Sequence, residues 1–312
     1  MSRGVAQGAQ ADRQLPLGEE IFLDHAGHFV RDPRAASRAL ARAGFAPTPV
    51  SVQTQPDPAG GAPRLTGTGN VTAMLTRGYV EVLFKTADTP LGQELDAAMA
   101  RHAGVHLVAF AVADAAGAHR RIGETGFRVR PLVDMQRPVE TMGEPGTAAF
   151  TVARLEPGEM PEGRIQLLTH RTEHMVWQPR WLSHPNGALG LASVTIAVGD
   201  LDDAAQRFGR LTGRQARASS LGQTIDLDRG RVELVTATTF GQMFPLVPIP
   251  SLPFIGAYGI AVRSLEIAEQ SLLRGGLTMQ RIGKNLVAAF PDELGCGAWV
   301  FSCPTEASAD PR

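Results

Sequence analysis

FLDHAGHFVRDPRAASRALARAGF, residues 22–45, is the stretch that decides the fold, because it recurs in three further copies along the chain. Each copy reads as an apolar strand, a polar break and a short amphipathic helix that ends near a glycine. The other copies are VHLVAFAVADAAGAHRRIGETGF (105–127), LASVTIAVGDLDDAAQRFGRLTG (191–213) and IGAYGIAVRSLEIAEQSLLRGGL (255–277). Self-similarity of this kind indicates one supersecondary unit that is used four times.

Three further strand-like runs follow each copy, so each unit reads βαβββ. In the first unit these runs lie at 49–54, 70–76 and 78–85, and a loop rich in proline and glycine is expected between the first two. One such unit is too small to bury its apolar face, so the units should pair. We therefore predict an α+β fold in which four βαβββ units pair into two open barrels.

The predicted pairs of units span residues 20–172 and 188–304, with a connector at 173–187. Residues 1–19 and 305–312 are expected to be flexible tails. All eight histidines lie between His25 and His184. We therefore expect the chemistry in the first pair, and expect the histidine-free second pair to be a scaffold or the contact of a homodimer.

The bulk composition favours a protein whose partner is a small molecule. With 30 basic and 31 acidic residues the net charge is −1, which gives no electrostatic footprint for nucleic acid or for an anionic membrane. No run approaches the roughly 18 apolar residues of a membrane-spanning helix, and the first residues lack the apolar segment of a secretory signal. Two cysteines make no disulfide framework, so a reducing, cytoplasmic setting is expected.

The repeated unit, with LDHAGHFVRD opening the first copy and YVEVLF closing it, resembles the vicinal oxygen chelate superfamily, and most closely its glyoxalase-like domain proteins. This superfamily includes glyoxalases, bleomycin-resistance proteins and extradiol dioxygenases, and the resemblance covers nearly the whole folded chain. It implies two glyoxalase/dioxygenase-like barrels. It also implies a divalent metal (Fe, Ni, Zn, Mn or Co) in the concave face of a pair, held by the first and last strands of each unit.

Counting seven residues back from the polar residue that follows each first strand aligns the four copies. The opening strands then supply His25, Leu107, Ser193 and Ala257, and the closing strands supply Glu81, Gln166, Glu233 and Trp299. His106 lies one residue before the aligned position. A slip of one residue turns a strand side chain to the opposite face unless a bulge restores its direction.

The resemblance makes His25 and Glu81 the predicted metal ligands and catalytic residues, with two further ligands among His106, Gln166 and His170. Glu81 lies in an apolar run, where burying a carboxylate without a partner is expensive. His170 follows Gln166 by four residues on the same strand face.

Trp177 and Trp181 lie four residues apart in the connector. They either pack the connector onto the barrel or form the wall of an apolar substrate pocket.

Three functions remain open from the sequence. The first is a metal-dependent enzyme, either a glyoxalase-type lyase or isomerase or a ring-cleaving dioxygenase, acting on a small substrate that has vicinal oxygens or an aromatic ring. The second is a metal-free protein of the bleomycin-resistance kind that sequesters a small molecule. The third is a metal-free enzyme in which His25 and Glu81 form an acid–base pair.

Overall fold

The computed structural model describes residues 13–57 and 59–304. Of the two predicted tails, residues 1–12 and 305–312 lie outside the described residues. Within the described ranges no helix is both long enough and apolar enough to cross a bilayer.

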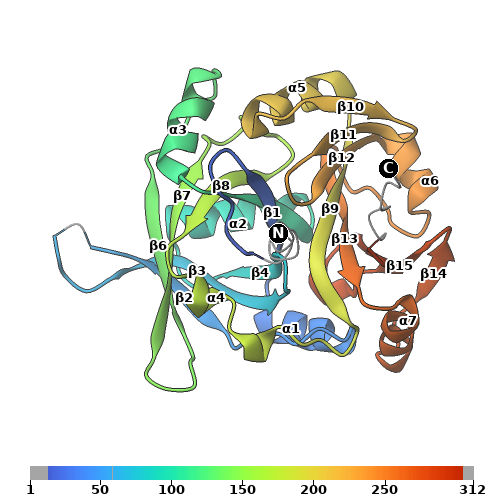
Figure 1. Ribbon diagram of the computed structural model, residues 1–312, viewed down its shortest axis with the longest axis horizontal. Helices are drawn as coiled ribbons and strands as arrows, with labels where there is room; N and C mark the ends of the chain where they lie inside the picture. The colour runs from blue at the N-terminus through green and yellow to red at the C-terminus, as the bar shows by residue number, and fades with distance from the viewer. Residues whose placement is uncertain (1–12, 58, 305–312) are drawn as a thin grey trace, which may run out of the picture.

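The first eight strands form a closed barrel in the order β1-β4-β3-β2-β6-β7-β8-β5 (Figure 1). Their bounds are β1 Ile21–Phe29, β2 Ser51–Gln55, β3 Arg64–Met74, β4 Tyr79–Lys85, β5 Gly104–Val112, β6 Val133–Val139, β7 Gly146–Arg154 and β8 Arg164–His170. Each of the first two units contributes four strands, and β1 and β5 join the units as an antiparallel pair. The barrel is closed where an open one was expected, because Thr54 of β2 pairs with Gln136 of β6 and the Ser51 hydroxyl donates to the Pro138 carbonyl.

The second eight strands form an open sheet in the order β10-β11-β12-β9-β13-β16-β15-β14. Their bounds are β9 Ala188–Val198, β10 Ala216–Ser219, β11 Gly222–Asp226, β12 Arg231–Thr236, β13 Phe254–Val262, β14 Met279–Ile282, β15 Asn285–Ala289 and β16 Ala298–Ser302. The edge strands β10 and β14 have four residues each and are largely exposed, so they leave this sheet unclosed. The predicted α+β fold of four paired βαβββ units is thereby confirmed.

The helix of each repeat begins where the sequence pattern placed it. These helices are α1 (Pro33–Arg42), α3 (Ala115–Glu124), α5 (Leu201–Thr212) and α7 (Leu265–Arg274). The polar residue that ends each first strand caps the helix by accepting backbone N–H bonds, as the carboxylate of Asp32 does from Arg34 and Ala35. Helices α1 and α7 lie at one side of the molecule and α3 and α5 at the opposite side (Figure 1).

Two helices that the sequence pattern did not predict close the concave faces of the sheets. Leu95 and Met99 of α2 (Pro90–Arg101) pack against Leu107 and Phe29 at one end of the barrel. In the second sheet, α6 (Ala237–Met243) places Phe240 against the concave face. The connector forms the short helices α4 (Glu173–Val176) and η1 (Pro179–Trp181), and η2 (Asp292–Leu294) precedes β16.

The expected loop before β3 is shorter than predicted. Strand β3 begins at Arg64, so the glycine-containing run TGTGN, residues 66–70, belongs to a strand and not to that loop. Close packing explains why glycines occur in this strand. A Cβ on Gly67 would lie within 3 Å of Thr89, and a Cβ on Gly69 would lie within 3 Å of Phe84. These glycines therefore serve close packing rather than a turn.

A buried polar network joins the two halves of the chain. His28 of β1 bonds the Leu294 carbonyl through Nδ1 at 2.9 Å and the Tyr258 hydroxyl through Nε2 at 2.9 Å. The Trp299 Nε1–H donates to the same hydroxyl at 2.6 Å. A carbonyl only accepts, so Nδ1 carries the proton, Nε2 accepts from the hydroxyl, and the imidazole is neutral. His28 is therefore structural.

This network makes the stability of the fold depend on pH. Burial lowers the pKa of His28 from 6.5 to about 4, against an opposing contribution of the Leu294 carbonyl. The unfolded chain binds the proton first, so the stabilisation is complete above about pH 6.5 and is lost as the pH falls through about 4. Between about pH 7.5 and pH 5 we expect His28 to account for a loss of about 2 kcal/mol in the free energy of unfolding.

Urea unfolding at both pH values checks this expectation. Between the two pH values, the free energy of unfolding of His28→Gln should fall by about 2 kcal/mol less than that of the wild type. The control variant His174→Gln changes an exposed histidine and should keep the wild-type difference. A His28→Gln variant with the same pH dependence as the wild type would contradict the assignment.

Candidate functional site

A β-bulge in β1 builds the candidate site. The register of β1 against β5 shifts between Leu23 and His25, so Asp24 is the extra residue in the strand. Such bulges redirect side chains, and here both Asp24 and His25 are buried. Gly78, at φ +74°, lies directly beneath the bulge, since a Cβ on it would come within 2.5 Å of the Asp24 carbonyl oxygen. Only glycine fits this position without displacing β1.

The Asp24 carboxylate holds two histidines at once. Its Oδ2 lies 2.7 Å from His25 Nδ1 and its Oδ1 lies 2.9 Å from His170 Nε2. Burial alone would raise the pKa of Asp24, but His170 and His25 outweigh this and hold the pKa well below its ordinary value. An ionised carboxylate only accepts, so both facing nitrogens carry protons. The ring of His25 is thereby fixed with Nε2 directed away from Asp24.

The sequence analysis did not assign Asp24 a role. Asp24 could have been found in the way Glu81 was, because it is a carboxylate within a run of apolar strand residues. In the structure it is fully buried.

His25 Nε2 faces Glu81, the other predicted catalytic residue. The Glu81 side chain is buried, and its Oε2 lies 3.4 Å from His25 Nε2. Its Oε1 accepts a hydrogen bond of 2.7 Å from the Asn70 amide. The Tyr79 ring stacks on the imidazole with the centroids 4.3 Å apart. Two lone pairs would repel one another at this separation, so a proton on either Nε2 or Oε2 would stabilise the pair. The pair can thus give or take that proton.

The counting rule found the right positions on the opening strands. Leu107 lines the same cavity as His25, and Ser193 lines the concave face of the second sheet. Among the closing strands, Glu81 and Gln166 line the first cavity and Glu233 lines the second face.

The assignment of Trp299 to the fourth closing position is wrong. The register pairs Gly259 with Val300, as it pairs Gly27 with Glu81. Trp299 instead packs in the network between the two halves.

His106 does not join His25 in the cavity, which corrects the predicted ligand set. The register shifts between Gly27 and His28, so His106 is itself a bulge residue, but its side chain faces the other way. Its Nε2 bonds the His102 carbonyl at 2.7 Å, and the two imidazole rings lie 4.1 Å apart. The bulge leaves the cavity position to Leu107, which cannot bind a metal.

His170 lies behind Asp24, outside the lining of the cavity. Its ring packs 4.6 Å from that of Trp177, and within the described structure its Nδ1 has no hydrogen-bond partner. Through Asp24 it positions His25, and it is not placed as a third ligand beside Glu81.

Neither tryptophan of the connector lines the cavity, which corrects the predicted substrate wall. Trp177 is buried in a cluster with Met74 and Tyr79, and Trp181 packs at its edge with the Arg180 guanidinium 4.7 Å from its ring. These contacts match the other reading of the pair, in which the tryptophans pack the connector onto the barrel.

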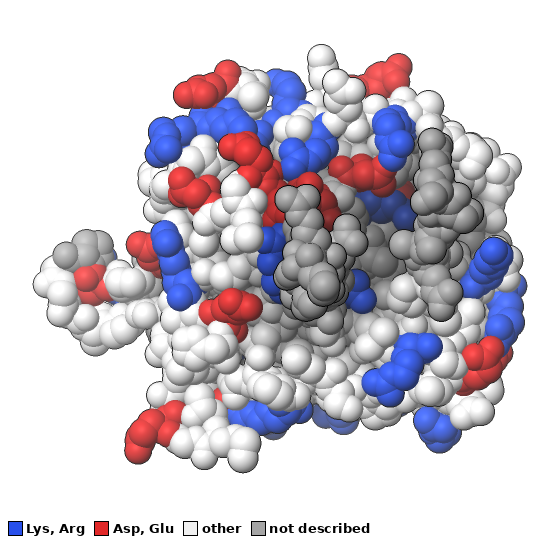
Figure 2. Space-filling model, in the orientation of Figure 1, with Lys and Arg blue, Asp and Glu red and all other residues white. Residues whose placement is uncertain are grey.

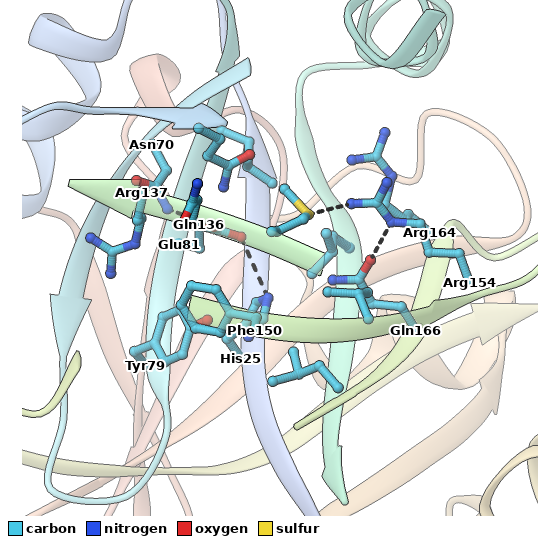
Figure 3. Close-up of a pocket in the computed structure, with 16 residues that line it drawn as sticks. His25, Asn70, Tyr79, Glu81, Gln136, Arg137, Phe150, Arg154, Arg164 and Gln166 are labelled. Carbon is cyan, nitrogen blue, oxygen red and sulfur yellow. Dashed lines mark hydrogen bonds and ion pairs between the residues drawn. The ribbon is translucent and has the colours of Figure 1, made fainter. Parts of the chain in front are cut away.

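The cavity inside the barrel is narrow and unusually rich in arginine (Figure 3). Its volume of about 40 Å³ leaves room for a few waters around the side chains. The apolar part of its wall consists of Leu83, Leu107, Met135, Phe150, Val152 and Leu168. Three arginines and one carboxylate carry the charge, namely Arg137, Arg154, Arg164 and Glu81.

This arrangement coincides with a family match. Residues 23–212, which include all of the barrel except the first two residues of β1, match the model of the glyoxalase-like domain. The chain belongs to this family. The glyoxalase-like domain is part of the vicinal oxygen chelate superfamily, so the resemblance drawn from the repeats is confirmed. Comparison with the sequences of curated proteins gives no match.

Solved structures share the fold of this glyoxalase-like protein at low identity. A hypothetical protein from Staphylococcus aureus has a TM-score of 0.61 at 9% identity, covering 91% of this chain and 99% of that one. A variant of 4-hydroxymandelate synthase from Streptomyces coelicolor has a TM-score of 0.57 at 14% identity, covering 92% and 94%. The Mn(II)-bound glyoxalase from Novosphingobium aromaticivorans has a TM-score of 0.52 at 12% identity, covering 92% and 83%.

The side chains present fall short of a catalytic metal centre. Nowhere in the described residues do three or more His, Cys, Asp or Glu side chains meet in a metal-binding arrangement. His25 and Glu81 supply two ligands, whereas catalytic sites usually have three of this strength. Gln166 is the only further predicted ligand in the cavity, and its Oε1 faces Arg154 Nε at 3.4 Å. The neighbouring arginines also repel a dication.

We therefore expect the purified protein to contain well below one divalent metal per chain. Elemental mass spectrometry on protein prepared without a His-tag or chelator measures this content, followed by calorimetric titration with Mn, Ni and Zn. A stoichiometry near one that disappears in both His25→Ala and Glu81→Ala, but persists in Glu233→Ala, would contradict the expectation.

Proposed function

We propose that this glyoxalase-like protein is an enzyme that moves a proton on a small substrate bound in the β1–β8 barrel. The observation that carries the proposal is the buried pair of His25 and Glu81, whose Nε2 and Oε2 atoms lie 3.4 Å apart. Asp24 supports it, because a carboxylate on Nδ1 fixes the tautomer and direction of a catalytic imidazole.

In the proposed reaction the substrate carries a C–H bond next to a carbonyl group. The Glu81 carboxylate takes the proton from carbon, while the Nε2–H of His25 donates a hydrogen bond to the carbonyl oxygen. Negative charge then develops on that oxygen inside a wall that contains three arginines, which stabilise it. Return of the proton to a neighbouring carbon completes an isomerisation, so no oxidant or other co-reactant is required.

A metal-dependent mechanism would have to use the same two side chains. A divalent metal would replace the proton of the pair, and His25 and Glu81 would be its ligands. Lewis-acid polarisation of the substrate oxygen is what such an ion would supply. Ring-cleaving dioxygenase chemistry is less well supported, because it typically uses two histidines and a carboxylate, and the described cavity wall contains one histidine.

A metal-free binding protein is the second candidate. It is favoured by Leu107 at the position equivalent to His25 and by Gln166 at the position equivalent to Glu81, since both replacements remove reactive groups from the cavity. A binding protein of this kind would have no evident use for Asp24, His25 and Glu81, whose burial is energetically unfavourable.

Exchange of carbon-bound hydrogen in D2O tests the proposal without a known substrate. We expect NMR to show deuterium uptake into at least one member of a panel of 2-hydroxy ketones, 2-hydroxy aldehydes and 2-oxo acids. His25→Gln and Glu81→Gln should each slow this uptake by roughly 10²- to 10⁴-fold, because each removes one partner of the proton transfer.

Glu233→Gln is the matched control, because Glu233 occupies the equivalent position in the histidine-free second sheet. It should leave the exchange rate unchanged. Equal rates in all three variants would refute the site, and absence of exchange across the panel would favour the binding protein.

A further inference from the structure

We propose that the substrate carries an anionic oxygen group, a carboxylate or a phosphate, and that Arg137 binds it. This inference rests on the proposed function only in that it names the substrate class of the same cavity. Arg137 lies on β6, is 6% exposed and lines the cavity. Among the described residues no carboxylate lies within the 4.0 Å of an ion pair with its guanidinium.

An unpaired buried guanidinium is costly. Removing a cation from water without a counter-ion costs several kcal/mol in real proteins. The two carboxylates of the site already have other partners. Glu81 lies beyond ion-pair distance and bonds Asn70 and His25, while Asp24 is held by His25 and His170. Burial accordingly lowers the pKa of Arg137, and Tyr79 and Glu81 only partly offset this.

The other two arginines of the cavity differ from Arg137. Arg164 is paired with Glu94 at 3.2 Å. Arg154 contacts only neutral groups, Gln166 and the Met135 sulfur, and burial together with the charge of Arg164 lowers its pKa to about 9. Both lie at the Gln166 end of the cavity, whereas Arg137 lies at the end with Glu81 and Tyr79 (Figure 3). An anion on Arg137 would therefore sit beside the proton-transfer pair.

The arginines of the cavity do not extend a basic patch on the visible surface. On the face shown in Figure 2, basic and acidic side chains are interspersed. A guanidinium binds carboxylate and phosphate oxygens through two parallel hydrogen bonds, which suits a small acid in a narrow cavity. The substrate class that fits both features is a small oxo or hydroxy acid, or a phosphate ester of similar size.

Calorimetric titration with pyruvate, with inorganic phosphate and with the neutral ester methyl pyruvate tests this assignment. We expect at least one of the two anions to bind and the ester to bind far more weakly. Which anion binds separates a carboxylate from a phosphate site. Arg137→Gln should weaken the anion by roughly 10- to 100-fold, the loss of one charge-assisted contact, and should leave the ester unchanged. Arg231→Gln, a change in the second sheet, is the matched control and should bind like the wild type.

Thermal unfolding without ligand separates binding from a structural role. If the role of Arg137 is to bind an anion, the ligand-free Arg137→Gln variant should unfold at the same temperature as the wild type or at a higher one. Adding anions should no longer raise the unfolding temperature of the variant. A clear loss of stability in the ligand-free variant would overturn the assignment. So would equal anion affinity in wild type and variant, or no binding of either anion by the wild type.

The outcome is independent of the proton-transfer test. Anion binding that is lost in Arg137→Gln but retained in Glu81→Gln, in a protein that exchanges no carbon-bound hydrogen, would leave the anion site standing while the proposed reaction fails. Exchange of carbon-bound hydrogen, with no effect of Arg137→Gln on anion affinity, would support the proposed reaction and refute the anion site.

Discussion

The buried Asp24 carboxylate is the constraint on which the candidate site depends. A fully buried charge must be matched by donors, and here two histidines from strands β1 and β8 supply them. This requirement fixes the tautomer of His25 and directs its Nε2 toward Glu81. It also explains Gly78, since the bulge that introduces Asp24 leaves no space for a side chain beneath it. Removing the charge would therefore loosen the histidine, the turn and the acid–base pair together.

The four repeats keep this bulge but not its chemistry. The extra residues at the equivalent points are Asp24, His106, Ala192 and Gly256. The residues that follow them toward the concave face are His25, Leu107, Ser193 and Ala257. Backbone geometry is thus shared, because strand pairing depends little on these side chains, while only one copy supplies both an acid and a base. In the second sheet α6 covers only part of the concave face, and the hollow of about 1130 Å³ beside it contains Glu233 but no histidine.

Local sequence patterns predicted most of the fold, and they singled out His25 and Glu81, two of the residues that meet in the candidate site. The caps that end each first strand, such as Asp32, also set the count that found His25, and both are local features. His106 and Leu107 are neighbours in a bulge, and only one of them can turn toward the cavity. Counting residues along the sequence cannot tell which one does. Arg137 carried no signal at all. It becomes significant only because closure of the barrel through β2 and β6 brings it opposite Glu81, and that closure is a long-range pairing.

The charge of the cavity links the questions of metal and substrate. Three arginines and one glutamate line a narrow space with apolar walls, where charges interact more strongly than in water. A dication entering this space would add to the excess of positive charge, whereas an anionic substrate would reduce it. If substrate were to bind first, its charge would make the pair of His25 and Glu81 a better place for a second positive charge, whether a proton or a metal ion. Arg137 and His25 would then serve the same bound substrate, because the anion held by the first reduces the excess of positive charge around the second.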